Sequence, residues 1–468
     1  MFDSAYCRRL ALLLVAACRP SLPSPATPLV ASAEDALPPA PEVAPIEMPS
    51  LPSPEVFSIE GGPTLWVVPN PHVPAVGIRA VTRRGEDGAH PLGLVRVTAG
   101  EMAQALEELF PDADAGGTAS VHSAAVSFNV PSSEVSRALD GLAAVLVNGR
   151  LDSDEAILRR RAQRVQSYEG AEHSSLLSAW LSTLDHRRGG DARVGWAHRP
   201  IVDRLKTFDQ SAIQACRSER FAPADTAFLV VGPVEPSEVA LLFRERFGEW
   251  TERVPRRSAP EISARPPRAA ALSRMTSSER VHVLYTHSAP PPEHPDRAAF
   301  DVVVELLGGL FSSRLNALRE QHAYTYGAHA YVSAAELKDL LVVRSDFEPE
   351  RVEASLRTLF DELRGFRAAE IPRSRIAVAR NRIWANLSYR ADGLAYLGML
   401  ERSWATETPI STLAERYGAL AELTSARLRE VVRQHLSPAD GLLVLTGDFD
   451  RVGGFVVRRN TDGFHLER

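Results

Sequence analysis

Residues 306–327 read LLGGLFSSRLNALREQHAYTYG, and this stretch decides how the second half of the 468-residue chain is organised. Apolar residues within 299–307 recur at the three- and four-residue spacing of a helix with one buried face. Gly308–Gly309 predict the end of that helix, and Ser312–Ser313 predict the cap of a second one. The alternation across Tyr326–Val332 then predicts a strand.

The elements LLGG, SSRLN, LRE and YTYG, in this order and spacing, resemble the second-domain signature of the insulinase/pitrilysin family of zinc peptidases. That family includes the mitochondrial processing peptidase and two-subunit bacterial relatives. In it, an Arg and a Tyr from this region reach the active site in the other domain and hold the substrate backbone. The resemblance assigns these roles to Arg319 and Tyr326, whose donors suit carbonyl oxygens and a developing oxyanion. Without the motif, the same residues read as a surface Arg and a half-buried strand Tyr.

Composition excludes several classes of function. With 44% hydrophobic and 24% charged residues, the chain beyond its first segment is typical of a soluble globular protein with two or three domains. A formal net charge of −6, without a basic tract interleaved with aromatics, gives no basis for nucleic-acid binding. Three cysteines make neither a disulfide framework nor a zinc-finger spacing.

The N-terminus reads as an export signal, with Arg8 and Arg9, a short apolar run and small residues before Cys18. Val15–Cys18 resembles a bacterial lipoprotein cleavage box, which implies lipidation of Cys18. An ordinary secretory signal with an incidental Cys is the alternative. We expect a periplasmic protein held by lipid at the cell envelope, in particular at the outer membrane. The Pro- and Ala-rich residues 19–54 predict an extended tether.

An internal duplication divides the folded part of the chain. Phe221–Gly232 aligns without gaps on Leu436–Gly447, and both copies keep Pro-Ala-Asp, an apolar strand and a closing Gly. More weakly, a strand precedes the pair His90-Pro91 in one half and His294-Pro295 in the other. The mixed pattern predicts an α+β fold of two homologous domains, each a mostly antiparallel sheet with helices on one face. By resemblance, which covers about 55–452, they form a clamshell.

The expected boundaries follow the same features. They are a lipoprotein-type signal peptide at 1–18, a tether at 19–54, an insulinase-like N-terminal domain with a degenerate zinc site at 55–250, a linker at 251–275, an insulinase-like C-terminal domain with the Arg/Tyr pair at 276–457, and a tail at 458–468. The linker assignment rests on its many Pro, Arg and Ser residues.

The zinc motif of the family, H-x-x-E-H on a helix, is absent. Registered on Gly93, its five positions read RVTAG at 96–100. Moving the register by one places Val97, Gly100 and Glu101 at the three functional positions. Neither H-x-x-E-H nor H-E-x-x-H occurs anywhere in the chain.

The third zinc ligand of the family is also missing. The helix expected over 155–166 resembles the one that supplies it, but its end reads QRVQ, and Arg164 there would repel a metal ion. His322 and His329 flank the Tyr turn without a third ligand at a suitable spacing. We expect no catalytic residue, no metal site and no cofactor in this chain.

Gly116–Gly117 and the strand expected over 118–130 resemble the family's edge strand, which binds an extended peptide by adding it to the sheet. The resemblance therefore implies a non-catalytic subunit, inactive alone, which binds peptide substrates and supplies Arg319 and Tyr326 to a zinc-bearing partner subunit of the same family. Zinc is expected only in that partner. One alternative is a peptide-binding or scaffolding protein without peptidase activity, and another is an independent metal-dependent hydrolase.

Overall fold

The computed structural model describes residues 46–467, except for 87–89, 92, 121, 172–182, 184–202, 204, 252–269, 275–278, 311, 334–338, 438–440, 449–451, 453–455 and 461–462. The chain divides into two compact units, Met1–Ala44 and Pro45–Arg468, and all described elements belong to the second. The predicted signal, Cys18 and most of the predicted tether lie outside the described residues. No helix in the described ranges is long and apolar enough to cross a membrane.

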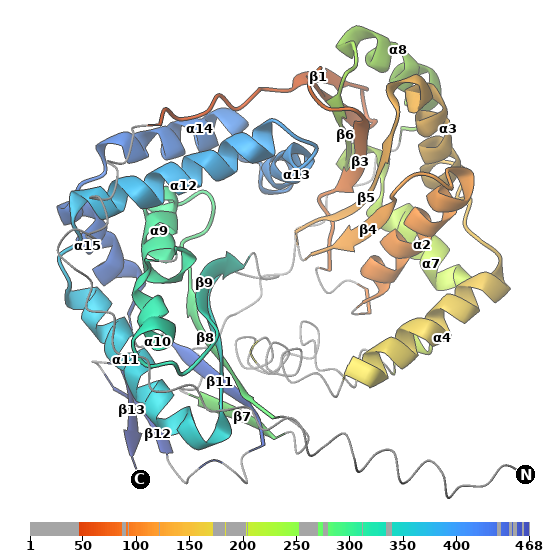
Figure 1. The fold of residues 1–468 in the computed structure, drawn as a ribbon. Helices are drawn as coiled ribbons and strands as arrows, with labels where there is room; N and C mark the ends of the chain where they lie inside the picture. The colour runs from red at the N-terminus through yellow and green to blue at the C-terminus, as the bar shows by residue number, and fades with distance from the viewer. Residues whose placement is uncertain are drawn as a thin grey trace, which may run out of the picture. The chain divides into compact units, whose positions relative to one another are not determined.

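The first half is built on a six-stranded sheet in the order β1-β2-β6-β3-β5-β4 (Figure 1). Neighbouring strands are antiparallel except β2 and β6, which are parallel. The strands are β1 (Glu55–Ser58), β2 (Thr64–Pro69), β3 (Val76–Thr82), β4 (Gly116–Ala119), β5 (Ala124–Val130) and β6 (Thr226–Gly232). Every residue of β6 is buried, as expected for a central strand of apolar residues.

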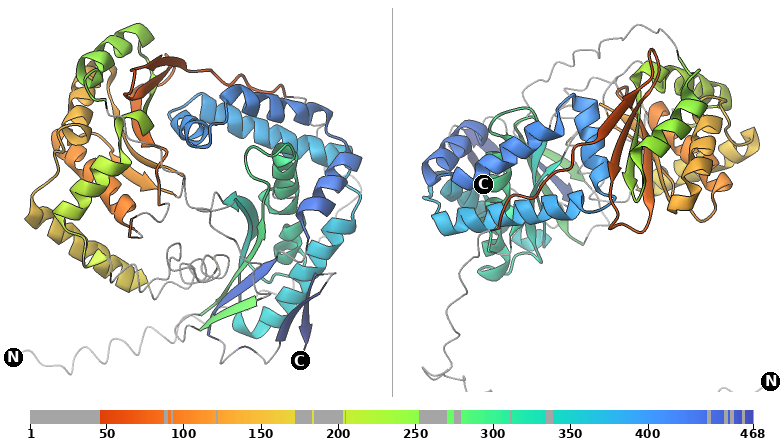
Figure 2. Two further views of the ribbon diagram at one scale, coloured as in Figure 1. Left: turned by 180° about the vertical axis from the view of Figure 1, so that it is seen from behind. Right: turned by 90° about the horizontal axis from the view of Figure 1, so that it is seen from above.

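Amphipathic helices cover one face of this sheet (Figure 2). Phe228 of β6 packs against Phe243 and Phe247 of α8, with ring centroids 5.2 and 4.4 Å apart. Local signals set the helix starts: the Asp209 carboxylate caps α7 through the Ala212 N–H at 2.8 Å, and Pro236 opens α8. The helices are α2 (Leu94–Leu109), α3 (Val135–Leu146), α4 (Asp154–Ala171), α7 (Gln210–Arg220) and α8 (Pro236–Phe247).

The second half repeats the plan with a five-stranded sheet in the order β7-β11-β8-β10-β9. Only β7 and β11 are parallel, so these strands match β2, β6, β3, β5 and β4 in order and direction. This match supports the duplication read from the sequence. The strands are β7 (Ala270–Arg274), β8 (Val281–Ser288), β9 (Ala328–Ser333), β10 (Leu340–Phe347) and β11 (Leu442–Gly447), and a separate hairpin holds β12 (Val456–Asn460) and β13 (Gly463–Glu467).

The helices of the second half follow the predicted order, with local differences. The helices are α9 (Arg297–Val304), the π-helical turn η4 (Glu305–Gly309), α10 (Ala317–Glu320), α11 (Val352–Ala368), α12 (Arg373–Ala391), α13 (Tyr396–Thr406), α14 (Ile410–Gly418) and α15 (Ser425–His435). The predicted serine cap is wrong, because a 3₁₀ turn at Arg314–Asn316 precedes α10 and the Ser313 side chain makes no capping bond. The predicted strand starts at Ala328, which leaves Tyr326 in the turn before it.

The first sheet is covered on its second face as well, by α13 from the other half of the chain. Tyr396, Leu400 and Trp404 of α13 share a buried cluster with strand residues that include Val81 and Leu229. The helices of the first half therefore lie on one face, as predicted, and α13 of the second half covers the other face. Residues far apart in the chain form one core here, which joins the two halves.

Three predicted boundaries also need correction. The last residues of the predicted linker form β7, because they complete the parallel edge beside β11. The predicted tail forms β13, which pairs with β12. The end of the predicted tether packs on the fold: Leu51 is buried, and the Pro52 carbonyl accepts a hydrogen bond from the Tyr396 hydroxyl at 2.5 Å.

Candidate functional site

Tyr326, one of the two residues assigned from the sequence, stands out from a well-supported turn. Its side chain is 87% exposed, which is unusual for a large aromatic residue. Beneath it, the buried Thr325 hydroxyl donates to the Gly327 carbonyl at 3.0 Å and accepts from the Gly327 N–H at 3.1 Å. The Ser345 hydroxyl of β10 donates to Thr325 Oγ1 at 3.1 Å. The backbone around Tyr326 is therefore held while its phenol faces solvent.

Arg319 lies at the end of α10, where the buried Leu318 anchors the helix. The Tyr324 N–H bonds to the Leu318 carbonyl at 2.9 Å, and Ala323 adopts a left-handed conformation with φ of 50°. The Arg319 guanidinium lies 3.5 Å from the Glu320 carboxylate, and both side chains are about half exposed. Such a surface pair is weak, so the guanidinium can bind another acceptor.

Two aromatic contacts shape the same turn. The His322 ring stacks on Tyr324 with centroids 5.2 Å apart, which gives these residues a structural role in the turn. The Arg280 guanidinium lies 5.3 Å from the Tyr326 ring centroid. A cation over the ring restrains the side chain without covering its hydroxyl.

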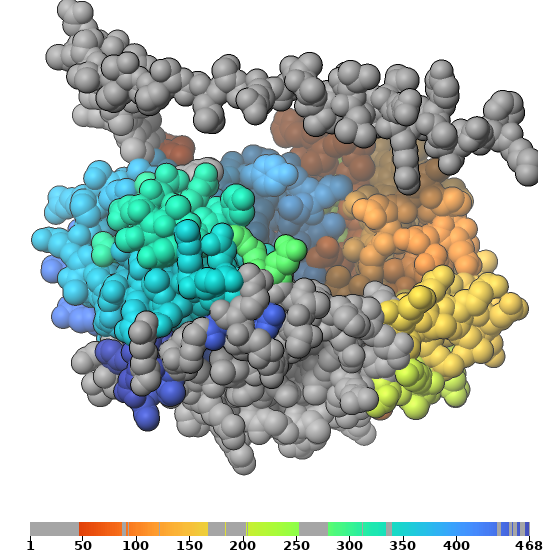
Figure 3. Space-filling view, turned by 60° about the horizontal axis from the view of Figure 1, so that its bottom comes forward, coloured from red at the N-terminus to blue at the C-terminus, as the bar shows by residue number. Residues whose placement is uncertain are grey.

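The position of the family's zinc motif holds a buried ion cluster. Glu101 of α2 has a side chain with no exposed area, and two arginines of α4 bind its oxygens. Arg160 Nη2 lies 2.5 Å from one oxygen and Arg164 Nη1 lies 2.5 Å from the other. Arg160 also pairs with Asp152 at 2.6 Å. In the space-filling view, α4 (yellow) lies beside the orange residues of the first half (Figure 3).

These residues do not fit a zinc ion. In the register shifted by one, Val97 and Gly100 offer no ligand atom, and two guanidinium groups occupy the oxygens of Glu101. The sequence predicted that Arg164 would repel a metal ion, but it did not predict that Arg160 and Arg164 both bind Glu101. The four-residue spacing of the two arginines and a Glu on the apolar face of α2 were the available signals.

The expected edge strand is shorter than predicted. The stretch predicted as one strand forms both β4 and β5, and only the four-residue β4 lies at the edge of the sheet. Gly117 of β4 touches the helix behind it, since a Cβ there would lie 2.2 Å from the carbonyl carbon of Ala99. Only glycine permits this close approach.

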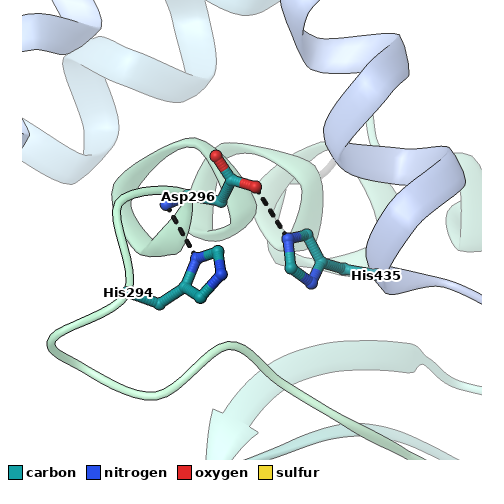
Figure 4. Close-up of side chains that lie close together, drawn as sticks. All are labelled: His294, Asp296 and His435. Atoms are coloured by element: carbon teal, nitrogen blue, oxygen red, sulfur yellow. Dashed lines mark hydrogen bonds and ion pairs between the residues drawn. The ribbon is translucent and has the colours of Figure 1, made fainter.

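A third group of side chains was not predicted as a site from the sequence. His294, Asp296 and His435 place one ligand atom each within 4.8 Å of one another, and theirs is the sole such group of three among the described residues (Figure 4). Asp296 is 4% exposed; its Oδ2 lies 2.8 Å from His435 Nε2, and Arg427 binds Oδ1. His294 Nδ1 accepts the Asp296 N–H at 3.0 Å. The only signals in the sequence were the two-residue spacing of His294 and Asp296 and the position of His435 directly before the second copy of the repeat.

The chain is similar to known proteins along most of its length. Residues 207–383 match a family model described as Peptidase M16 inactive domain. An uncharacterized zinc protease of Mycobacterium leprae is 24% identical over 360 residues, which cover 74% of this chain and 78% of that protein. An uncharacterized zinc protease of Mycobacterium tuberculosis is 24% identical over 357 residues, with 74% and 79% coverage.

Solved structures share the fold. A peptidase M16 inactive domain from Pseudomonas fluorescens superposes with a TM-score of 0.73 at 18% identity, over 84% of this chain and 98% of that one. The periplasmic protease PqqL of Escherichia coli gives 0.70 at 14% identity, over 95% of this chain and 51% of that one. These likenesses confirm the predicted class of two α+β domains in a clamshell. Taken with the zinc-protease relatives, these matches show that the chain is similar to the insulinase (M16) peptidase family, and its sequence lacks the H-x-x-E-H motif.

Proposed function

We propose that this chain is a non-catalytic subunit that binds peptide and supplies Arg319 and Tyr326 to a zinc-bearing partner subunit of the same family. A contrast between the two halves of the chain supports the proposal. The first half holds Glu101 between two arginines where a metal would be needed, while the second half presents an exposed phenol on a supported turn. A pair that is exposed and free of strong partners suits substrate binding.

Peptide binding is supported by the sheet edges. Among the described strands, β4 and β9 each end a sheet, and an edge strand can add an extended peptide through its backbone groups. A cavity of about 320 Å³ lies beside β9, lined by Ala330, Tyr331 and Val332 of that strand and by α9, α12, α13 and α14. This volume accommodates a few side chains of a bound peptide.

The partner and the location complete the proposal. Zinc and its activated water come from the partner chain, and no residue of this chain takes part in metal chemistry there. Cys18 carries the lipid, so the folded part faces the periplasm from the envelope, in particular the outer membrane. The periplasmic location of PqqL supports this placement.

The test is reconstitution of peptide cleavage by the tagged chain and the partner recovered with it from detergent-solubilised membranes. Arg319→Ala and Tyr326→Phe should each lower kcat by about 10²-fold, the size of effect seen when one transition-state donor is lost. Exposed residues elsewhere serve as matched controls: Arg351→Ala, with a 53% exposed side chain, and Tyr389→Phe, 78% exposed, should leave the rate unchanged. Equal rates in all four variants would refute the proposed role of the pair.

The second candidate is a peptide-binding protein without a peptidase partner, favoured by the same sheet edges. Recovery of the chain alone, together with peptide affinity that does not depend on Arg319 and Tyr326, would support it. Recovery of an H-x-x-E-H chain in near-equal amount would decide for the split peptidase.

A further inference from the structure

The cluster of His294, Asp296 and His435 has the donor set of a transition-metal site. Two imidazoles and one carboxylate bind zinc and similar divalent ions, whereas magnesium and calcium prefer oxygen ligands. The two rings lie at 86° to each other with centroids 5.0 Å apart, so they are close together without stacking face to face. Figure 4 shows the residues converging from the loop before α9, the start of α9 and the end of α15.

The carboxylate is already oriented for a ligand role. Arg427 binds Oδ1 of Asp296, which leaves Oδ2 directed at His435 Nε2, 2.8 Å away. A ligating carboxylate is commonly held by such an outer hydrogen bond. Asp296 is almost fully buried, and 14% of the His435 side chain is exposed, so an ion can reach the site from solvent.

The equivalent place in the first half cannot do the same. α7 and α15 end immediately before the two copies of the repeat, and their last residues are Arg220 and His435. Arg220 is buried, and a guanidinium group offers no lone pair, whereas an imidazole nitrogen can ligate a metal ion. Ligand chemistry at this position therefore exists in the second half alone.

We propose that His294, Asp296 and His435 bind one Zn²⁺ or a similar divalent transition ion, separate from any catalytic metal. The ion takes the place of the proton between His435 Nε2 and Asp296 Oδ2, and that proton passes to solvent. His294 contributes a ring nitrogen, since its ligand atom lies within 4.8 Å of those of the other two residues. Arg427 keeps Oδ1 and offsets part of the carboxylate charge, so the ion is exchangeable. This site departs from the expectation of a metal-free chain.

The experiment is calorimetric titration of the purified full chain, without partner or peptide, with ZnCl₂ after removal of metal by a chelator. We expect one Zn²⁺ per chain at about pH 7.5 and weaker binding at about pH 5.5, because metal binding to imidazole and carboxylate ligands competes with protons. His435→Gln and Asp296→Asn should each weaken binding by at least about 10-fold. His90→Gln, the counterpart of His294 in the first half, should leave it unchanged. Absence of saturable binding to the intact chain would overturn the site.

A second variant and a second readout keep the test valid if a substitution at Asp296 or His435 unfolds the protein. His294→Gln changes a loop residue and should also lower the affinity by at least about 10-fold. In the intact chain, excess Zn²⁺ should raise the midpoint of thermal unfolding at about pH 7.5 only, since an ion that binds the folded state stabilises it. Binding of equal strength and stoichiometry in His294→Gln and His435→Gln would refute the proposal, whatever the outcome for Arg319 and Tyr326.

Discussion

The two halves of the molecule carry the same kind of charge pair, but they bury it differently. Glu101 and Glu305 each lie eleven residues after the histidine of their His-Pro pair, on the helix that follows. Glu101 is fully buried and bound by Arg160 and Arg164. Glu305 is 19% exposed and pairs with Arg382 of α12, which lies 3.0 Å away and is about half exposed.

This comparison explains how the first half keeps its fold without the zinc motif. A metal site would tie α2 to α4 through ligands; here the tie is a buried carboxylate between two guanidinium groups. The second half has a weaker pair of the same type, between η4 and α12. The first half therefore uses, in a stronger form, a contact that the second half also has.

A second comparison concerns the contact of these helices with the edge strands. In the first half the glycine is on the strand, where a Cβ on Gly117 would lie 2.2 Å from the backbone of Ala99. In the second half it is on the helix, where a Cβ on Gly308 would lie 2.4 Å from the Ala330 nitrogen. Both halves need one glycine per contact, because two backbones meet there.

The largest expected effect is a difference in the free energy of unfolding between variants of the two charge pairs. Glu101→Ala should lower the free energy of unfolding by about 3–5 kcal/mol, because it leaves two partly buried guanidinium groups without a counter-charge. Glu305→Ala should cost about 1 kcal/mol or less, since its partner is half exposed. Urea unfolding of the full chain measures both. Replacing Glu101, Arg160 and Arg164 together by Leu should restore much of the free energy lost in Glu101→Ala. Equal losses in Glu101→Ala and Glu305→Ala would contradict the comparison.

The next largest effect is expected where a Cβ is added at the two glycine contacts. Gly117→Ala and Gly308→Ala should each cost about 1–3 kcal/mol, because backbone atoms cannot move aside cheaply. The control is Gly398→Ala in α13, where a Cβ would meet nothing within 4 Å and alanine should stabilise the helix by up to about 1 kcal/mol. A loss at Gly398 as large as those at the two contacts would show that the close approaches do not matter.

Opposite pH dependences should distinguish two other carboxylates. Burial raises the pKa of Glu86 in the first half above its usual 4.5, against the bonds from the Arg96 and Gly93 N–H groups. Its contribution to stability is therefore full below pH 4.5 and is lost as the pH rises through the raised pKa. The hydrogen bond from His282 lowers the pKa of Asp346 in the second half from 3.8, so its contribution is present above pH 3.8 and is lost as the pH falls through the lowered pKa.

Unfolding free energies measured from about pH 3 to pH 7 check these signs. Glu86→Gln should flatten the decline above pH 4.5, and Asp346→Asn should flatten the decline below pH 3.8. The matched control is the same curve for the intact chain. A steeper decline above pH 4.5 in Glu86→Gln would reverse the assignment for the first half.

The smallest effect is expected at the exposed pair. Arg319→Ala and Tyr326→Phe should change the free energy of unfolding by no more than about 0.5 kcal/mol, because both side chains face solvent. Thermal unfolding of the two variants beside the intact chain measures this. A larger loss would assign the residues a structural role and weaken the proposal that they serve a substrate.

Local pattern was enough for much of this molecule. The apolar runs of β6 and β11 and the Pro-Ala-Asp before each predicted the duplicated strands, because a buried strand needs nothing beyond its own side chains to be recognised. The family motif singled out Tyr326, but the alternating pattern placed it in a strand, and it lies in the turn before β9. The absence of H-x-x-E-H could be read directly from the residues.

Contacts between distant residues were decided only by the tertiary structure. Arg164 and Glu101 are 63 residues apart, Asp296 and His435 are 139 apart, and Arg79 of β3 meets Glu401 of α13 across 322. Periodicity shows which face of an element is buried, but not what lies against that face. Which charges pair, which sheet α13 covers and which histidines meet a carboxylate depend on how the elements pack, and packing joins residues whatever their separation in the chain.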